Sequence, residues 1–402
     1  MTTTIINKNK KPNVPNSTDK GNAIRNLPNL RFPEFREEWE EHELSEYLDF
    51  KNGLNPKPNQ FGKGIKFISV MDILNNAVIT YDCIRASVSV SEEDMSAFSV
   101  QKGDILFQRS SETLEDVGRA NVYVDDIPAV FGGFVIRGKQ KTNYNPLFFK
   151  YLLSSPLARK RIIRMGAGAQ HFNIGQEGLS KVKLPFACID EQNKIAKILY
   201  LLDKRISLQN KIIDKLQTLI KGLSNKIFES LQGQECRLGD IATITNGNSN
   251  VQDAITEYKD DLYPFFDRSE EIKYLPTFLF DKEAIIYPGE GAEFFPRYFN
   301  GKFALHQRCY AIFDFNKAVN PQFLFCFLKT QNSYFIRNAV GSTVPSLRLD
   351  TFQKLKVVVP SKETQSIVSS LLFTLEKKHN TEKMLLQTLL KQKHYLLRQM
   401  FI

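Results

Sequence analysis

Two Asn-Pro dipeptides are the residues of this chain whose type and spacing come nearest to a catalytic motif. Asn145-Pro-Leu-Phe148 and Asn320-Pro-Gln-Phe323 have the form of a motif that positions the target amino group of adenine for methyl transfer. That reaction also needs a glycine-rich cofactor loop, and the nearest candidate, Phe131-Gly-Gly-Phe134, is not where such a loop would stand. Both dipeptides precede an apolar run, where Asn is favoured as a helix cap and Pro in the first turn. We therefore interpret them as helix starts and not as a catalytic site.

Other catalytic and metal-binding patterns are missing from the sequence. It contains no G-x-x-x-x-G-K-[ST] phosphate loop, no H-E-x-x-H zinc motif and no G-x-S-x-G elbow. The 5 cysteines lie far apart and form no C-x-x-C, which predicts neither a disulfide framework nor a zinc site. We expect no catalytic residue and no metal on this chain, and a reducing cytoplasm as its simplest location.

The charge balance favours a polyanionic partner. Among 402 residues, Lys and Arg number 54 and Asp and Glu 44, so the formal net charge is +10. Such a balance bears on association and not on fold. The sequence contains no run of about 18 apolar residues, so no membrane span is predicted. Residues 1–26 are rich in Asn, Lys and Thr and are expected to form a disordered arm.

The sequence repeats itself once, in unbroken order. Three pairs of similar segments carry the repeat: Leu44–Gly53 with Leu238–Gly247, Asn145–Leu153 with Asn320–Leu328, and Gln192–Asp203 with Gln365–Glu376. Each copy begins with short strand-like runs and a few helical stretches, which predict a mixed α/β (α+β) globule. Examples of these runs are Ile65–Val70, Asp104–Phe107, Val130–Ile136, Ala284–Tyr287 and Cys309–Phe313.

Each copy ends in one long predicted helix, Glu191–Ser230 and Glu363–Met400. Apolar residues at alternating steps of three and four form a coiled-coil seam, with Gln209 in its one polar slot. The first seam is Leu199, Leu202, Ile206, Ile213, Leu216, Ile220, Leu223 and Ile227. The second is Leu372, Leu375, Leu386, Leu389, Leu396 and Met400, interrupted by His379, Glu382 and Lys393. Glu382 holds the repeat position of Gln209. We expect the two helices to form an antiparallel pair; the alternative is that each packs on its own globule.

These patterns predict five segments and a pseudo-twofold internal repeat. The segments are the arm 1–26, a first globule 27–187, a helix 188–232, a second globule 233–360 and a helix 361–402. Two separated globules suit a two-part target on a regular polymer such as duplex DNA, where two major-groove sites on one face lie about 34–36 Å apart.

The repeated phrases, together with the opening Pro33-Glu-Phe-Arg…Trp39, resemble the specificity subunits of type I restriction–modification enzymes from about Leu27 to Ile402. The resemblance implies that each globule is a target recognition domain for one half of a split, asymmetric sequence in double-stranded DNA. It also implies that the helices set the spacing and bind two modification (methyltransferase) subunits, and that a motor-nuclease subunit completes the restriction enzyme. S-adenosylmethionine, ATP and Mg would then be bound on those partners only. The second copy has Thr364-Gln365 where the first has Glu191-Gln192, a departure from the pattern.

Candidate DNA contacts are Arg, Lys and amide or hydroxyl side chains, which grip phosphates or reach base edges. The Gly-rich segments that begin at Gly166 and Gly341 follow basic residues and offer backbone N–H groups to a phosphate. In the first globule the candidates are Lys57, Lys63, Lys66, Arg109, Ser110, Ser111, Arg119, Arg161, Arg164, Gln170, His171 and Asn173. In the second they are Arg268, Arg297, Tyr298, His306, Gln307, Arg308, Arg337, Ser342, Thr343, Ser346 and Arg348.

The leading hypothesis is therefore a non-catalytic subunit that recognises a DNA sequence. One alternative is a helical scaffold or adaptor without a nucleic acid ligand. A fused restriction and methylation enzyme is another, but it would need motifs that this chain lacks.

From the missing motifs we predict that the purified chain alone neither methylates nor cleaves DNA. The check is transfer of labelled methyl groups from S-adenosylmethionine to duplex DNA, with the isolated chain and then with modification subunits added. Methyl transfer by the isolated chain would contradict the prediction.

Overall fold

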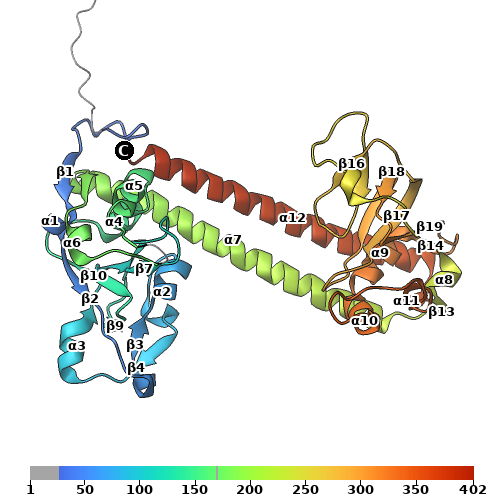
Figure 1. Ribbon diagram of the computed structural model, residues 1–402, viewed down its shortest axis with the longest axis horizontal. Helices are drawn as coiled ribbons and strands as arrows, with labels where there is room; N and C mark the ends of the chain where they lie inside the picture. The colour runs from blue at the N-terminus through green and yellow to red at the C-terminus, as the bar shows by residue number, and fades with distance from the viewer. Residues whose placement is uncertain (1–26, 169–170) are drawn as a thin grey trace, which may run out of the picture. The chain divides into compact units, whose positions relative to one another are not determined.

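The computed structural model describes residues 27–168 and 171–402 (Figure 1). The predicted arm 1–26 therefore lies outside the described residues. The chain divides into two compact units. The first extends to Arg205 and also contains Leu389–Ile402, and the second is Ile206–Thr388. Each unit thus holds one globule and part of both long helices. The boundary between the units lies within these helices, which were predicted to be separate segments.

The first unit is a mixed α/β globule. Its sheets have the strand orders β2-β10-β6-β8, β4-β3-β9-β5, β1-β12 and β11-β7. The strands are β1(Glu40–Glu43), β2(Leu48–Asn52), β3(Phe61–Ile68), β4(Ala86–Val88), β5(Ser99–Val100), β6(Ile105–Gln108), β7(Ser110–Ser111), β8(Ala120–Val122), β9(Ala129–Phe131), β10(Val135–Gln140), β11(Phe172–Asn173) and β12(Lys183–Phe186). The helices are α1(Leu44–Tyr47), η1(Pro58–Gln60), α2(Val70–Asn75), η2(Tyr81–Cys83), α3(Glu92–Phe98), α4(Pro146–Leu153), α5(Pro156–Ile163), α6(Gln176–Ser180) and the start of α7(Ile189–Ser230).

The second unit repeats this plan with fewer residues. Its sheets have the orders β14-β19-β17-β18-β15-β16 and β13-β20. The strands are β13(Gln234–Arg237), β14(Thr243–Asn246), β15(Tyr263–Phe266), β16(Lys273–Leu275), β17(Phe280–Pro288), β18(Arg297–Leu305), β19(Cys309–Phe313) and β20(Lys356–Val359). Its helices are α8(Leu238–Ile241), η3(Val251–Asp253), α9(Pro321–Lys329), α10(Asn332–Asn338), α11(Leu349–Gln353) and most of α12(Lys362–Gln399). In both units the strand that enters the globule pairs antiparallel with the strand that precedes the long helix.

Two of the predicted strand runs are wrong in extent. The run Val130–Ile136 is divided between β9 and β10, which belong to different sheets and are joined by a tight turn at Gly132-Gly133. The amide of Val135 donates to the Gly132 carbonyl at 2.8 Å and closes that turn. The run Ile65–Val70 ends at Ile68, because Val70 begins α2. Apolar sequence alone did not reveal the change of direction, since glycine in a strand pattern also fits a bulge.

The Asn-Pro dipeptides begin helices, as predicted. The Asn145 side-chain oxygen accepts from the amide of Phe148 at 3.0 Å, and Asn320 accepts from Phe323 at 3.3 Å, with Pro in the first turn of both helices. A buried glutamine joins each of these helices to the long helix that follows. Gln192 accepts from the Asn145 amide at 3.0 Å, and Gln365 accepts from the Asn320 amide at 2.7 Å. The second copy therefore keeps the contact made by its glutamine.

The glutamate of the first copy has a different role. Glu191 is fully buried and accepts two hydrogen bonds from Arg31, at 2.7 and 2.8 Å, and one from the Trp39 indole at 3.0 Å. Trp39 also contacts Phe401 edge to face. Glu191 thus ties the opening segment of the chain to the start of α7, and Trp39 extends this tie to the chain's C-terminal end. Thr364, at its position in the second copy, has no carboxylate for such a contact.

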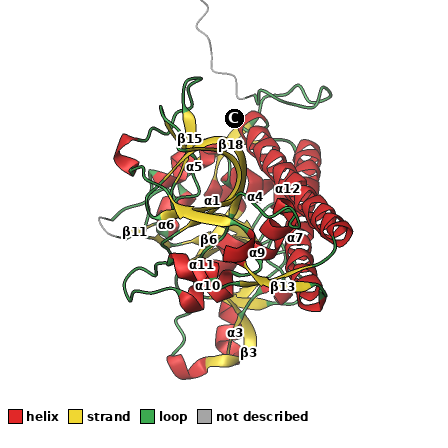
Figure 2. Ribbon diagram, turned by 90° about the vertical axis from the view of Figure 1, so that its right-hand side faces the viewer, coloured by secondary structure: helices red, strands yellow, loops and turns green. Residues whose placement is uncertain are grey.

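The two long helices pack antiparallel within each unit, as predicted (Figures 1 and 2). None of the predicted seam residues is exposed. In the second unit, Gln209 donates to the Glu382 carboxylate at 2.5 Å and to the Glu382 backbone carbonyl at 3.1 Å. Gln209 and Glu382 occupy equivalent positions of the repeat, and in an antiparallel pair such positions meet only at a local twofold axis. These two polar interruptions of the seam are therefore paired with each other.

A second polar cluster lies in the seam of the first unit. Asp203 is buried and accepts from Tyr151 at 2.8 Å, from Lys150 at 3.2 Å and from Lys393 at 2.6 Å. Burial alone would raise the pKa of the Asp203 carboxyl, but Lys150 and Lys393 hold it below its usual range. Burial lowers the pKa of Lys150 to about 8, against the opposing effect of Asp203. One carboxylate thus links the globule, α7 and α12.

We predict that Asp203→Ala destabilises the protein by about 3–5 kcal/mol, because buried Lys150 and half-buried Lys393 lose the carboxylate that they share. The measurement is urea unfolding at pH 7. Asp214→Ala, at an exposed site on the same helix, is the control and should stay within about 0.5 kcal/mol of wild type. Because the folded pKa of Asp203 is lowered, its contribution is present above pH about 4 and is lost as the pH falls through that folded pKa. Equal midpoints for the two variants would contradict the prediction.

Candidate nucleic-acid interface

A tight turn of the same construction occurs in both units. In the first unit the turn Gly132–Phe134 joins β9 to β10, and in the second the turn His306–Arg308 joins β18 to β19. The amide of Cys309 donates to the His306 carbonyl at 2.9 Å, as Val135 does to Gly132 at 2.8 Å. We name these turns the first and second recognition turns.

The Asn-Gly dipeptides of the repeat hold the recognition turns in place. The amide of Gly53 donates to the Val135 carbonyl and that of Gly247 to the Cys309 carbonyl, both at 3.2 Å. A Cβ atom on Gly53 would lie 2.1 Å from the Gly132 carbonyl oxygen, and one on Gly247 would lie 2.0 Å from that of Leu305. Only glycine permits this approach, so the motif found in the sequence has a steric cause.

A second loop borders each recognition turn, and it is the Gly-rich segment of the repeat. The amide of Ile174 donates to the Arg109 carbonyl at 2.9 Å, and that of Leu347 donates to Gly289 at 2.8 Å. In the first unit β7 pairs with β11, so the predicted residues Ser110 and Asn173 lie side by side and their side chains are hydrogen-bonded.

The second loop of the second unit makes the same backbone pairing. Glu290 stands opposite Ser346 in an antiparallel bridge, and their side-chain oxygens are 3.5 Å apart. Both units therefore have one backbone framework, built from an Asn-Gly segment, a recognition turn and a Gly-rich loop.

The side chains on the two frameworks differ in chemistry. The first recognition turn presents Phe134, whose side chain is 68% exposed, beside an apolar hollow of about 480 Å³. The second presents His306, Gln307 and Arg308 beside a polar hollow of about 600 Å³. Arg308 pairs with Glu290 at 2.5 Å. Burial lowers the pKa of His306, which favours the neutral ring at pH 7.

Two further predicted residues are placed at these frameworks, and several others are accessible on the same units. Arg109 donates to the Gly133 carbonyl at 3.2 Å, and Arg268 lines the second hollow. The other members of this group are half-exposed or exposed: Lys57, Lys63, Ser111, Arg119, Arg164, His171, Arg337, Ser342, Thr343 and Arg348. Arg119 is paired with Asp116 at 2.6 Å. Gln170 lies outside the described residues.

Four predicted residues are occupied with bonds inside their own unit. Lys66 donates to the Ile84 carbonyl at 2.8 Å, and Arg161 donates to Glu41 and to the Lys183 carbonyl, each at 2.5 Å. Arg297 donates to the Ser269 carbonyl, and Tyr298 to Glu283. These side chains support the sheets, and we leave them out of the proposed interface.

Phe134 and Glu290 were not predicted as site residues. The sequence contained a signal for both, because alignment of the two copies gives Phe134 and Arg308 equivalent positions, and likewise Ser110 and Glu290. That alignment requires strand positions, which the drifting spacing between the copies obscures.

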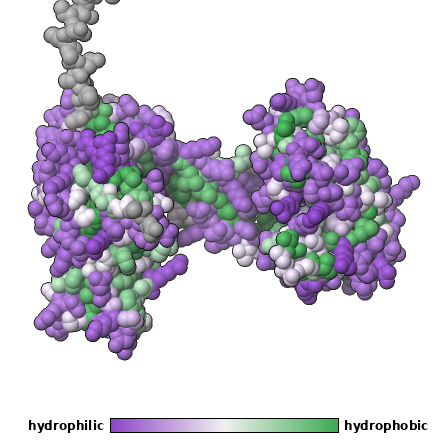
Figure 3. Space-filling view, in the orientation of Figure 1, coloured by the Kyte–Doolittle hydropathy of each residue, from purple (hydrophilic) through white to green (hydrophobic). Residues whose placement is uncertain are grey.

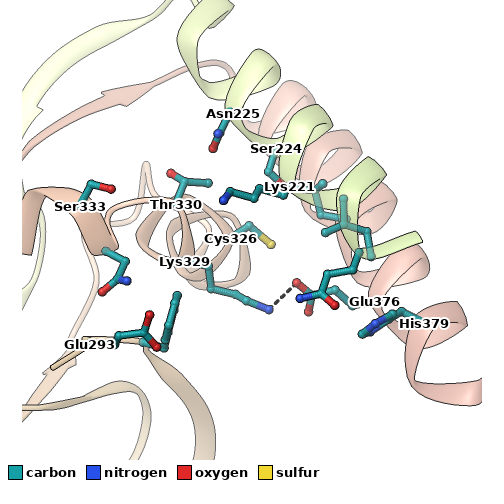
Figure 4. Close-up of a pocket in the computed structure, with 15 residues that line it drawn as sticks. Lys221, Ser224, Asn225, Glu293, Cys326, Lys329, Thr330, Ser333, Glu376 and His379 are labelled. Carbon is teal, nitrogen blue, oxygen red and sulfur yellow. Dashed lines mark hydrogen bonds and ion pairs between the residues drawn. The ribbon is translucent and has the colours of Figure 1, made fainter. Parts of the chain in front are cut away.

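The second unit contains a further hollow (Figure 4). It lies between α9 and the long helices, where Lys329 pairs with Glu376 beside Cys326 and His379. Burial raises the pKa of the Cys326 thiol to about 12, so no thiolate is present at neutral pH. Among the described residues, no group of three or more His, Cys, Asp or Glu side chains could hold a metal ion. No described helix is long and apolar enough to cross a membrane.

We predict that Gly53→Ala destabilises the protein by about 1–3 kcal/mol, because the added Cβ must displace the first recognition turn. The measurement is urea unfolding. Gly222→Ala is the matched control: this glycine lies within α7 with nothing within 4 Å of its Cβ position, so alanine should stabilise by up to about 1 kcal/mol. The steric argument fails if Gly53→Ala is as stable as wild type.

Comparison with known proteins agrees with this internal repeat. The family described as "Type I restriction modification DNA specificity domain" matches residues 36–218 and 233–391. The chain is 27% identical over 208 residues to the putative type I restriction enzyme MjaX specificity subunit of Methanocaldococcus jannaschii, covering 50% of this chain and 48% of that protein. It is 29% identical over 138 residues to the EcoDI specificity subunit of Escherichia coli, covering 34% and 30%. The matches thus span about half or less of these curated relatives.

A solved structure supports the fold over a larger part of the chain. The type I restriction–modification S subunit from M. genitalium has a TM-score of 0.65 at 18% identity, covering 94% of this chain and 99% of that one. Since the family matches both copies of the repeat and most of the sequence, this chain belongs to the type I restriction–modification DNA specificity domain family.

Proposed function

We propose that this chain is the DNA sequence-recognition subunit of a type I restriction–modification complex. It reads a two-part, asymmetric target in double-stranded DNA and directs methylation and restriction by partner subunits. The observation that carries the proposal is the pair of frameworks with equivalent backbone bonds and different side chains. One scaffold used twice, with its exposed residues changed, suits two half-sites of different sequence.

Phosphate and base contacts fall to different residues in this proposal. Exposed cations around the frameworks attract phosphates and position the duplex without reading it. The recognition turns carry the side chains that reach base edges, where Arg and Gln discriminate by hydrogen bonds in the major groove. The residues proposed for phosphates are Lys57, Lys63, Arg164, Arg268, Arg337 and Arg348.

The proposed partners are two modification subunits and a motor-nuclease subunit, which bind S-adenosylmethionine, ATP and Mg in place of this chain. Support comes from α7, where apolar side chains are exposed at helical spacing on a face other than the seam (Figure 3). These residues are Ile198, Leu201, Leu208, Ile212 and Leu219. An exposed apolar stripe of this kind marks a site of protein association. The proposed location is the cytoplasm, where host DNA is modified.

The decisive experiment is methylome sequencing of a host with and without this gene. A methylated, two-part motif that appears only with the gene supports the proposal. Unchanged methylation, combined with no binding of the chain and its modification subunits to duplex DNA at low salt, would favour a helical adaptor instead.

We predict different effects for Arg308→Ala and Lys63→Ala on DNA binding by the complex with modification subunits. Arg308→Ala should cost about 1–3 kcal/mol on the target and relax the preference at one base pair, because it removes a base contact. Lys63→Ala should weaken binding to all sequences alike and reduce the salt slope by about one, because it removes a phosphate contact. The measurement is a titration of target and single-substitution duplexes at several salt concentrations. Identical sequence profiles for the two variants would refute this division of roles.

A further inference from the structure

Phe134 is an apolar side chain presented where the other unit presents an arginine. The first recognition turn holds it firmly, since its carbonyl accepts from the Arg109 amide at 2.9 Å and Arg109 also bonds Gly133. The turn itself is confined, because a Cβ on Gly132 would meet the Phe67 ring at 2.6 Å. A phenyl ring that is 68% exposed leaves most of its apolar surface in water and gains little from packing within its own unit. Its place in the framework points to a contact made in a complex.

The surface around Phe134 is apolar at its centre and cationic nearby. The hollow beside it is lined by Phe61 and Met71, which are 43% and 60% exposed, and by buried Phe67. Within the described part of the chain, the residues that line this hollow include no Asp or Glu. Ser110 reaches its rim, Arg109 precedes Ser110, and Lys57 and Lys63 are exposed on either side of Phe61 in the sequence. An apolar patch without acids and with cations near it suits an anionic partner that carries a small apolar group.

We propose that Phe134 and the adjoining hollow receive the C5-methyl group of a thymine in the major groove of one half-site. This inference rests on the proposed function and adds to it one base pair and its chemistry. The thymine methyl is the apolar group on the base edges of that groove, and it is the feature by which apolar side chains recognise an A·T pair. The other half-site is contacted at the equivalent position by Arg308, which suits a hydrogen-bonding edge.

The test uses the complete chain with its modification subunits and the target duplex identified by methylome sequencing. Each thymine of both half-sites is replaced singly by deoxyuridine, which removes the methyl group and keeps every hydrogen bond. For the wild type we expect one thymine, in one half-site, at which the replacement weakens binding about fourfold, the effect of burying one methyl-sized group. The other thymines should show smaller changes.

Two variants of the turn and one control connect that thymine to Phe134. With Phe134→Ala, thymine and deoxyuridine duplexes should bind equally at that position, while discrimination elsewhere is kept. Phe134→Leu should keep part of the difference, because the apolar contact remains. Ile127→Ala removes an exposed apolar side chain of the same unit that does not line the hollow, and it should behave as wild type.

The outcomes separate this inference from the proposed function. If the complex does not prefer its target to random duplex, the proposed function itself fails. If it prefers the target but no thymine shows the effect, or the effect persists in Phe134→Ala, the thymine contact is overturned. Loss of modification-subunit binding by Phe134→Ala would instead assign the patch to a protein partner and would equally overturn it.

Discussion

The close approach of an Asn-Gly segment to a recognition turn is the constraint on which both halves of this protein depend. A Cβ atom added to Gly53 would lie 2.1 Å from a carbonyl oxygen, and one added to Gly247 would lie 2.0 Å from another, so no other residue fits at either position. Because neither backbone can retreat without breaking the hydrogen bonds at 3.2 Å, the position of the turn is fixed. Side chains placed on that turn therefore project from a fixed backbone.

When the backbone is fixed, a change of side chains alone can alter specificity without altering the fold. The two turns show this within one molecule, with Gly-Gly-Phe134 in one unit and His-Gln-Arg308 in the other. The backbone hydrogen bonds that the two turns share do not involve these side chains, so the side chains can change while the turn remains. Lys66 and Arg297 are basic, but each donates to a backbone carbonyl of its own unit. These hydrogen bonds tie a strand to a neighbouring segment, so the two side chains support the fold.

Most of the polar residues that interrupt the helix seam have polar partners in the structure. Gln209 meets Glu382, and Asp203 meets Lys393 together with two groups of the globule. A buried polar pair contributes little net stability compared with leucines, but a shift in register would leave each member unpaired at considerable cost. We regard these pairs as the reason that α7 and α12 adopt one alignment and not several.

The repeat, the two long helices, their seams and the helix starts at Asn145 and Asn320 could be predicted from the amino-acid sequence, because these features depend on local periodicity and capping. The sequence also identified candidate cations such as Lys57, Lys63 and Arg348 that the structure leaves exposed, since residue type alone marks them. Three-dimensional packing was needed to show that Val130–Ile136 is two strands with a turn between them, that Arg161 and Tyr298 are hydrogen-bonded within their own units, and that Phe134 and Glu290 stand on the frameworks. Those outcomes depend on hydrogen bonds between segments far apart in the chain, such as Ile174 with Arg109, and no local pattern encodes such partners.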